Sequence, residues 1–137
     1  MPNVNGIVET ALYVEDLARS GQWYERIFGF EPLLQDERMR GYGVANRHVL
    51  LLFRRGGSTQ PSEMPGGVIP PHDGRGTIHL AFAIDASEIA SWEDWLTAQN
   101  VPVESKVICE GGGTSLYFRD LDQHLVELIT PGCWAVY

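Results

Sequence analysis

Residues 7–16 read IVETALYVED, and their side chains alternate as those of a β-strand do. Asp16 ends the run and is a candidate helix N-cap, because its carboxylate can accept hydrogen bonds from the first free N–H groups of a helix. Apolar residues at helical spacing follow it: Trp23, Tyr24, Ile27 and Phe28. Gly29 is a typical helix end. The first thirty residues therefore predict a strand followed by a helix.

The same plan occurs again in the second half of the chain. Residues 78–85, IHLAFAID, predict another strand, and a helical stripe that ends near Asn100 follows. Strand-like segments around a turn come after each helix, at 39–44 and 48–53 and at 115–119 and 124–129. The pattern predicts an α+β fold built from two βαβββ modules. We expect a single domain over 1–137, with module one at about 5–56, module two at about 77–132, and a Gly-, Pro- and Ser-rich linker or loop over a site at 57–76.

Composition limits the classes of function. The chain has 137 residues, of which 44% are hydrophobic and 20% charged, as in folded globular proteins. Ten Lys and Arg against eighteen Asp and Glu give a net charge of −8, which disfavours binding to nucleic acid or to an anionic membrane. No apolar run reaches membrane-spanning length and no signal-peptide pattern is present, so we expect a cytoplasmic protein. Cys109 and Cys133 are too few for a disulfide framework, and we expect inert thiols.

Strand alternation places three chemically active side chains on related faces. Aligning Leu12 with Phe82 sets Glu9 opposite His79, and both point away from the side that a helix can cover. Glu127 points the same way from the last strand. If the sheet curls around that side, two carboxylates and an imidazole converge in a largely apolar pocket. A divalent cation would satisfy them, because these groups are among its usual ligands.

The chain resembles a known family over nearly its whole length. The supporting stretches are ALYVEDL at 11–17 with WY at 23–24 and FGF at 28–30, IPPHDG at 69–74 leading to HLAFAI at 79–84, and SLYFRD at 115–120 leading to HLVEL at 124–128. In this order and spacing they are similar to the vicinal oxygen chelate superfamily. That superfamily includes glyoxalase I, bleomycin-resistance proteins, fosfomycin-resistance enzymes and extradiol dioxygenases.

The resemblance implies a curved, half-barrel mixed sheet with helices on its outer face and a metal held within the curve. Carried over by position, the metal ligands fall on Glu9, His79 and Glu127, and the fourth site of four-ligand members falls on Leu51. The chain departs from the family at Glu9, where relatives commonly have His, and at Leu51, which is a hydrocarbon. The turn DLDQH at 120–124 also departs from the usual Asp-Pro-Asp-Gly.

A metal-dependent reaction is the first functional interpretation. The resemblance implies a divalent ion (Zn, Ni, Mn, Mg or Fe) that chelates a small oxygen-rich substrate for lyase, isomerase or transferase-type chemistry. Glu9 is either a ligand or the general base. Extradiol dioxygenase chemistry is disfavoured, because Fe(II) oxygenases generally use two His and one carboxylate. The predicted substrate contacts are Leu51, Tyr13, His72, Ser115 and Tyr117, with Gly111–Gly113 as a flexible loop beside the site.

The alternative is a metal-free protein of the bleomycin-resistance type, which sequesters a cationic drug. The negative charge and several aromatic residues suit such a ligand. These residues are Trp23, Tyr42, Trp92, Trp95 and Trp134, although Trp92 and Trp95 fit better as helix core. His48 and His124 begin equivalent strands, and we expect structural roles for them. Relatives are commonly homodimers, and we expect the same here.

Overall fold

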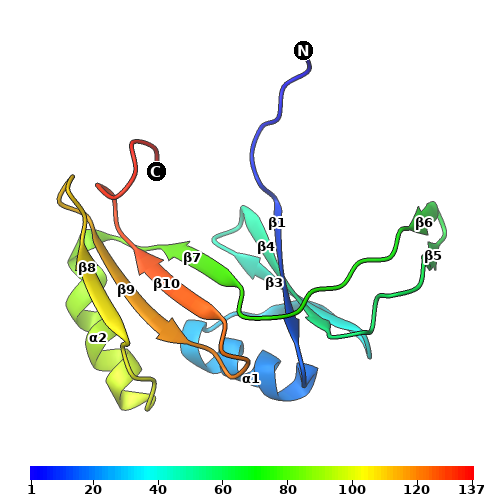
Figure 1. Ribbon diagram of the computed structural model, residues 1–137, viewed down its shortest axis with the longest axis horizontal. Coiled ribbons are helices and arrows are strands. Elements are labelled where there is room, and N and C mark those ends of the chain that lie inside the picture. The colour runs from blue at the N-terminus through cyan, green and yellow to red at the C-terminus, as the bar shows by residue number, and fades with distance from the viewer. The chain divides into compact units, whose positions relative to one another are not determined.

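The protein consists of two compact units in the computed structural model, which describes all residues from Met1 to Tyr137. The units are Met1–Arg75 and Gly76–Tyr137. Each contains one four-stranded mixed sheet and one α-helix (Figure 1). This architecture confirms the predicted α+β class and the repeated order of elements. Neither helix is long and apolar enough to cross a membrane.

The sheet of the first unit has the strand order β1-β4-β3-β2. Its elements are β1 (Glu9–Val14), α1 (Leu17–Phe28), β2 (Pro32–Gln35), β3 (Met39–Val44) and β4 (His48–Arg54). β1 runs parallel to β4, and the other neighbours are antiparallel. The strand at 39–44 was predicted with these bounds, whereas β2 was not located from the sequence.

Helix α1 begins and ends where the sequence predicted. The Asp16 carboxylate accepts a hydrogen bond from the Arg19 N–H at 3.0 Å, and Gly29 adopts the left-handed conformation with φ of 67°. The helix packs on β3 and β4 and buries Trp23 and Tyr24 there. The core of this unit therefore lies between α1 and one face of its sheet, and the helix does not cover the opposite face.

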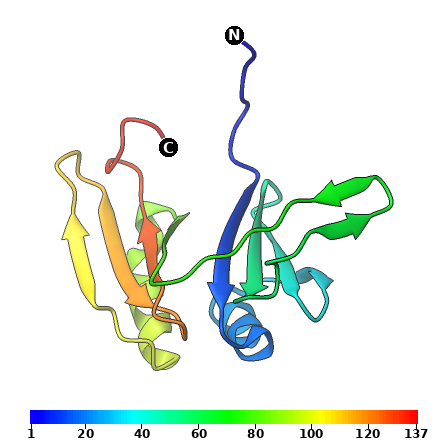
Figure 2. The same ribbon diagram turned by 45° about the vertical axis from the view of Figure 1, so that its right-hand side comes forward.

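The segment predicted as a linker is partly folded and belongs to the first unit. It contains a hairpin of β5 (Ser62–Met64) and β6 (Gly67–Ile69), which Figure 2 shows as a two-stranded arm. After the hairpin the chain returns to the sheet, where the His72 N–H donates to the Ser58 carbonyl at 2.9 Å. Gly74 lies so close to the Tyr13 ring that a Cβ atom would overlap it.

The second unit repeats the arrangement with the strand order β7-β10-β9-β8. Its elements are β7 (His79–Ala83), a 3-10 turn (Ala86–Glu88), α2 (Ile89–Ala98), β8 (Ser105–Ile108), β9 (Thr114–Arg119) and β10 (Leu125–Ile129). β7 is parallel to β10, as β1 is to β4. The two modules are thus equivalent strand for strand.

His48 and His124 have the structural roles predicted for them. The Nδ1 atom of His48 lies 2.9 Å from the Ile7 carbonyl, and the Nδ1 atom of His124 accepts from the Ile78 N–H at 3.0 Å. Each ring therefore binds the backbone just before the first strand of its own module. His124 is fully buried, which fits a hydrogen bond that serves the fold.

The cysteine prediction was wrong. Cys109 and Cys133 form a disulfide, so neither is a free thiol. The loop at Gly111–Gly113 packs against the chain after β10, because a Cβ atom on Gly113 would lie 2.6 Å from the Pro131 carbonyl oxygen. A sequence separation of 24 gave no sign that the β9–β10 hairpin brings Cys109 and Cys133 together.

Two predictions about aromatic residues also need correction. Trp95 was expected in the helix core but is 41% exposed, and Leu96 is the residue that α2 buries. Trp23 and Tyr42 were counted among the aromatics available to a cationic ligand, yet both are buried in the first unit. Neither ring can stack on a ligand without unpacking the core, which weakens the interpretation as a drug-sequestering protein.

Candidate functional site

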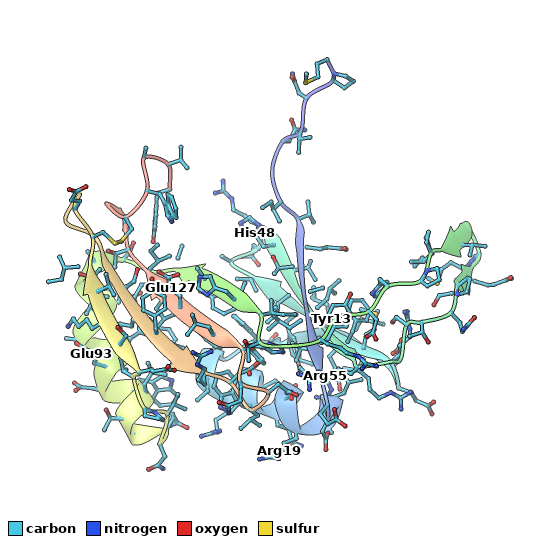
Figure 3. All side chains as sticks on the ribbon, viewed as in Figure 1. Tyr13, Arg19, His48, Arg55, Glu93 and Glu127 are labelled. Carbon is cyan, nitrogen blue, oxygen red and sulfur yellow. A yellow bond between two sulfur atoms is a disulfide. The ribbon has the colours of Figure 1, made fainter.

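His79 and Glu127 form a close pair on neighbouring strands of the second unit. In the parallel register of β7 and β10, His79 lies opposite Leu125 and Glu127 lies opposite Ala81. The His79 Nε2 atom is 3.1 Å from the Glu127 Oε2 atom. The Glu127 side chain is only 6% exposed, whereas that of His79 is 52% exposed. Figure 3 labels Glu127 on β10.

The hydrogen bond of the His79 Nδ1 atom indicates how the Nε2 atom faces Glu127. Nδ1 is 3.1 Å from the Leu125 carbonyl oxygen, which can only accept a hydrogen bond, so Nδ1 carries a proton. In a neutral ring, Nε2 then presents its lone pair to the Glu127 carboxylate. Two acceptors at this distance repel unless a proton or a metal cation lies between them. Metal-binding histidines are typically held in this way, with the second nitrogen donating to a carbonyl.

The spacing of the pair fits two ligands of one metal ion. Ligand bonds of about 2.0–2.1 Å place neighbouring donor atoms about 2.8–3.0 Å apart in octahedral geometry and about 3.3–3.4 Å apart in tetrahedral geometry. The observed 3.1 Å lies between these two spacings. Neither unit taken alone holds a group of three His, Cys, Asp or Glu side chains suited to a metal. In the second unit, the pair brings together two such side chains, His79 and Glu127.

Tyr117 lies beside the buried carboxylate. It lies opposite Glu127 in the antiparallel register of β9 and β10. Burial raises the pKa of the Tyr117 hydroxyl, a hydrogen bond to Glu127 and the charge of its carboxylate raise it further, and a hydrogen bond with Ser115 opposes them. Ser115 itself is buried, with its hydroxyl 3.7 Å from the Cys133 sulfur.

Glu9, the third predicted ligand, belongs to the first unit. It is the first residue of β1, is exposed, and lies at a pocket of about 580 Å³ on the sheet face opposite α1. Leu51, Tyr13 and His72 line the same pocket. The structure thus gathers the predicted residues in two places: four around the pocket of the first unit, and His79, Tyr117 and Glu127 in the second.

Tyr13 and His72 form one end of this pocket. The Tyr13 hydroxyl is 2.8 Å from the His72 Nδ1 atom, and the His72 ring meets the Phe53 ring edge-on with centroids 4.5 Å apart. Burial raises the pKa of Tyr13, and the carboxylate of Asp73 adds to this shift. Tyr13 is labelled in Figure 3.

Arg38 and Phe53 also line the pocket, and the sequence analysis missed both. The Arg38 guanidinium lies over the Phe53 ring, 5.7 Å from its centroid, and donates to the Ser58 hydroxyl at 3.1 Å. Phe53 could have been found, because it shares a face of β4 with Leu51. Arg38 gave no signal, since it precedes β3 in a turn without a repeating pattern.

Comparisons with known proteins find relatives in sequence and in fold. Metallothiol transferase FosB of Staphylococcus haemolyticus (strain JCSC1435) is 25% identical over 128 residues, 93% of this chain and 84% of the relative. The crystal structure of lactoylglutathione lyase from Agrobacterium tumefaciens matches with a TM-score of 0.88 and 29% identity over 98% of this chain and 99% of that chain. A mutant of the fosfomycin resistance protein FosX from Listeria monocytogenes, complexed with Mn(II) and 1S,2S-dihydroxypropylphosphonic acid, shares the fold. Its TM-score is 0.68 with 20% identity over 98% of this chain and 94% of that chain.

A family-level comparison covers most of the sequence. The profile of the Glyoxalase/Bleomycin resistance protein/Dioxygenase superfamily matches residues 6–128. That range includes every predicted ligand and both sheets except the last residue of β10. The chain belongs to the Glyoxalase/Bleomycin resistance protein/Dioxygenase superfamily, and the resemblance found in its sequence is confirmed.

Proposed function

We propose that the protein is a metal-dependent enzyme of the transferase or lyase type, acting on a small oxygen-rich substrate. The observation that carries the proposal is the His79–Glu127 pair, because the His79 Nδ1 atom bonds the Leu125 carbonyl and Nε2 lies 3.1 Å from the Glu127 carboxylate, close to the spacing of two metal ligands. In this proposal Glu9 supplies the third donor. The names of the relatives, a metallothiol transferase and a lyase, support the same class of chemistry.

A bound divalent ion would supply Lewis acidity at a substrate carbonyl, hydroxyl or phosphonate oxygen. The chain's own residues prepare for this. The Leu125 carbonyl fixes the orientation of the His79 ring, and Tyr117 holds the Glu127 carboxylate by a hydrogen bond. Leu51 cannot ligate, so the coordination position that it occupies in the family pattern stays free for water or for a substrate oxygen.

Metal binding by the chelator-treated protein tests the proposal. We expect stoichiometric uptake of at least one of Mn(II), Zn(II), Ni(II), Mg(II) or Fe(II) in titration calorimetry and elemental analysis. Glu127→Gln should weaken the affinity by about tenfold or more, because a neutral amide replaces a charged ligand. Glu93→Gln is the matched control, since Glu93 pairs with Lys106 on the surface of the same unit. No metal uptake by the unmodified protein, or equal effects of both variants, would overturn the proposal.

The role of Glu9 needs its own variant. We propose that Glu9 is a ligand, so Glu9→Gln should weaken metal binding about as much as Glu127→Gln does. If Glu9→Gln keeps full metal affinity and loses only turnover, Glu9 is the general base instead. Tight binding of a cationic drug by protein that takes up no metal at all would replace the enzyme with the sequestering function.

A further inference from the structure

The pocket of the first unit is a trough whose two ends have opposite chemistry. Residues of β1 that point to one face are about 6.6 Å apart, so Glu9 and Tyr13 lie about 13 Å from each other along the strand. Between them the register aligns Ala11 with Leu51 and Leu51 with Gly41. The middle of the trough is therefore apolar, with very small side chains on both sides of Leu51.

The end opposite Glu9 is rich in hydrogen-bond donors. Arg38 is held over Phe53 and bonded to the Ser58 hydroxyl, and no carboxylate pairs with its guanidinium. His72 uses Nδ1 for the Tyr13 hydroxyl, which leaves Nε2 open. The nearby Asp73 carboxylate accepts backbone hydrogen bonds from Gly56 and Gly74, which lower its pKa, and the positive charges of Arg75 and His72 lower that pKa further. A fixed guanidinium without an anion, at the wall of a pocket, is a typical anion-binding group.

We propose that this trough binds an elongated organic anion. The apolar body of the ligand contacts the middle of the trough, and its carboxylate or phosphate contacts Arg38 and His72. The proposal rests on the proposed function in one respect, because it places the reacting oxygens of the same molecule at the Glu9 end. The substrate class is then an acid with a flexible or aromatic apolar body of more than a few carbons. The net charge of −8 does not prevent this, since ionic strength screens distant charges beyond about 8 Å.

Titration calorimetry on the full chain without metal tests the proposal with butanoate, octanoate, octyl phosphate, octanamide and octylamine. We expect octanoate and octyl phosphate to bind, and octanamide and octylamine to bind at least about tenfold more weakly. Affinity should rise by about two- to fourfold for each added methylene between butanoate and octanoate. The ratio of octanoate to octyl phosphate affinities distinguishes a carboxylate from a phosphate substrate.

Arg38→Gln should weaken octanoate binding by about tenfold or more and leave metal affinity unchanged. Arg19→Gln is the matched control, because Arg19 is an exposed residue of α1 without a side-chain partner (Figure 3). Gly41→Leu gives a second route, since the new Cβ atom fits at 3.4 Å from the Leu51 side chain and the rest fills the trough. That variant should also lose octanoate binding while Arg38 stays in place.

Two results would overturn the inference: equal affinity for octanoate and octanamide, or equal affinities in Arg38→Gln and Arg19→Gln. Absence of octanoate binding in a protein that takes up metal rejects this inference and leaves the proposed function standing. Octanoate binding that depends on Arg38, in a protein that takes up no metal, supports the anion site and rejects the metal-dependent function.

Discussion

Gln123 adopts the left-handed backbone conformation, with φ of 66°, in the turn between β9 and β10. The Asp120 carboxylate organises this turn by accepting hydrogen bonds from the N–H groups of Asp122 at 2.9 Å and His124 at 2.8 Å. A side chain in this region costs about 1–2 kcal/mol, whereas glycine adopts it freely. The family's usual Asp-Pro-Asp-Gly has glycine where this chain has Gln123, which fits a position that requires the left-handed conformation.

Gln123→Gly should therefore stabilise the protein by about 0.5–1 kcal/mol, after the entropy that glycine adds to the unfolded chain is subtracted. Urea unfolding monitored by circular dichroism measures the change. Gln35→Gly in β2 is the control, because Gln35 lies in a strand with no positive φ, and glycine there should be neutral or destabilising. Destabilisation by Gln123→Gly would contradict the expectation.

The raised pKa of Tyr42 predicts how the stability of the protein changes at alkaline pH. Burial raises the pKa of Tyr42 to about 12, a hydrogen bond with Arg40 opposes this, and the carboxylate of Glu25 raises it further. The Tyr42 hydroxyl donates to Glu25 at 2.8 Å. In the unfolded chain the phenol titrates near 10, so the folded protein retains this proton longer. The stabilisation is complete below pH 10 and is lost as pH rises from 10 through about 12.

Tyr42→Phe should lower the free energy of unfolding at pH 8 by about 1–2 kcal/mol, because Glu25 loses a hydrogen bond. Between pH 9 and pH 11 the variant should lose less stability than the unmodified protein, since one raised pKa has been removed. Urea unfolding at these pH values gives both quantities. Parallel pH profiles for the two proteins would show that Tyr42 does not carry the alkaline effect.

At the scale of elements, the two sheet strands that could not be located from the sequence, β2 and β8, each lie at one edge of a sheet. β2 and β8 are exposed at every residue, so neither has the alternation of buried and exposed side chains that reveals a strand. The β5–β6 hairpin was missed for the same reason, since most of it is exposed. The other strands and α1 could be predicted because their apolar residues recur at strand or helical spacing, and Asp16 and Gly29 mark the two ends of the helix.

The disulfide is the element-scale feature with the largest expected energy. It joins the start of the loop between β8 and β9 to the segment after β10 and closes a loop of 24 residues. Loop-closure entropy predicts about 3 kcal/mol of stabilisation for this length. Cys133→Ser should lower the free energy of unfolding by that amount, and dithiothreitol should do the same to the unmodified protein.

The double variant Cys109→Ser with Cys133→Ser is the control for this experiment, because dithiothreitol should not change its stability. A thiol assay of the denatured, unreduced protein gives an independent readout and should find no free thiol. Two free thiols in that assay would contradict the bond seen in the structure.

At the scale of the whole molecule, the internal repeat made part of the site predictable. Aligning the modules drew attention to His79, strand alternation placed His79 and Glu127 on the same side of their strands, and the structure pairs them because β7 and β10 are neighbours. Glu9 as a third ligand stays a prediction. Arg38 could not be predicted, since it reaches the pocket from a turn and its partners Ser58 and Phe53 come from later segments. A sequence repeat therefore predicts site residues that lie on its strands, but not residues such as Arg38 that lie in a turn outside the repeat.

The exposed edge strands lead to a prediction about assembly. β8 ends its sheet and exposes Ile108 by 74%, beside Val107 in the same strand, and Lys106 is its one charged residue. Unpaired apolar edges of this kind favour association with another chain. We therefore expect a homodimer at micromolar concentration in light scattering coupled to size exclusion. Ile108→Lys should shift the mass toward the monomer, because a buried lysine at an interface is costly. Leu121→Lys, an exposed turn residue, should leave the mass unchanged, and a monomeric unmodified protein would contradict the expectation.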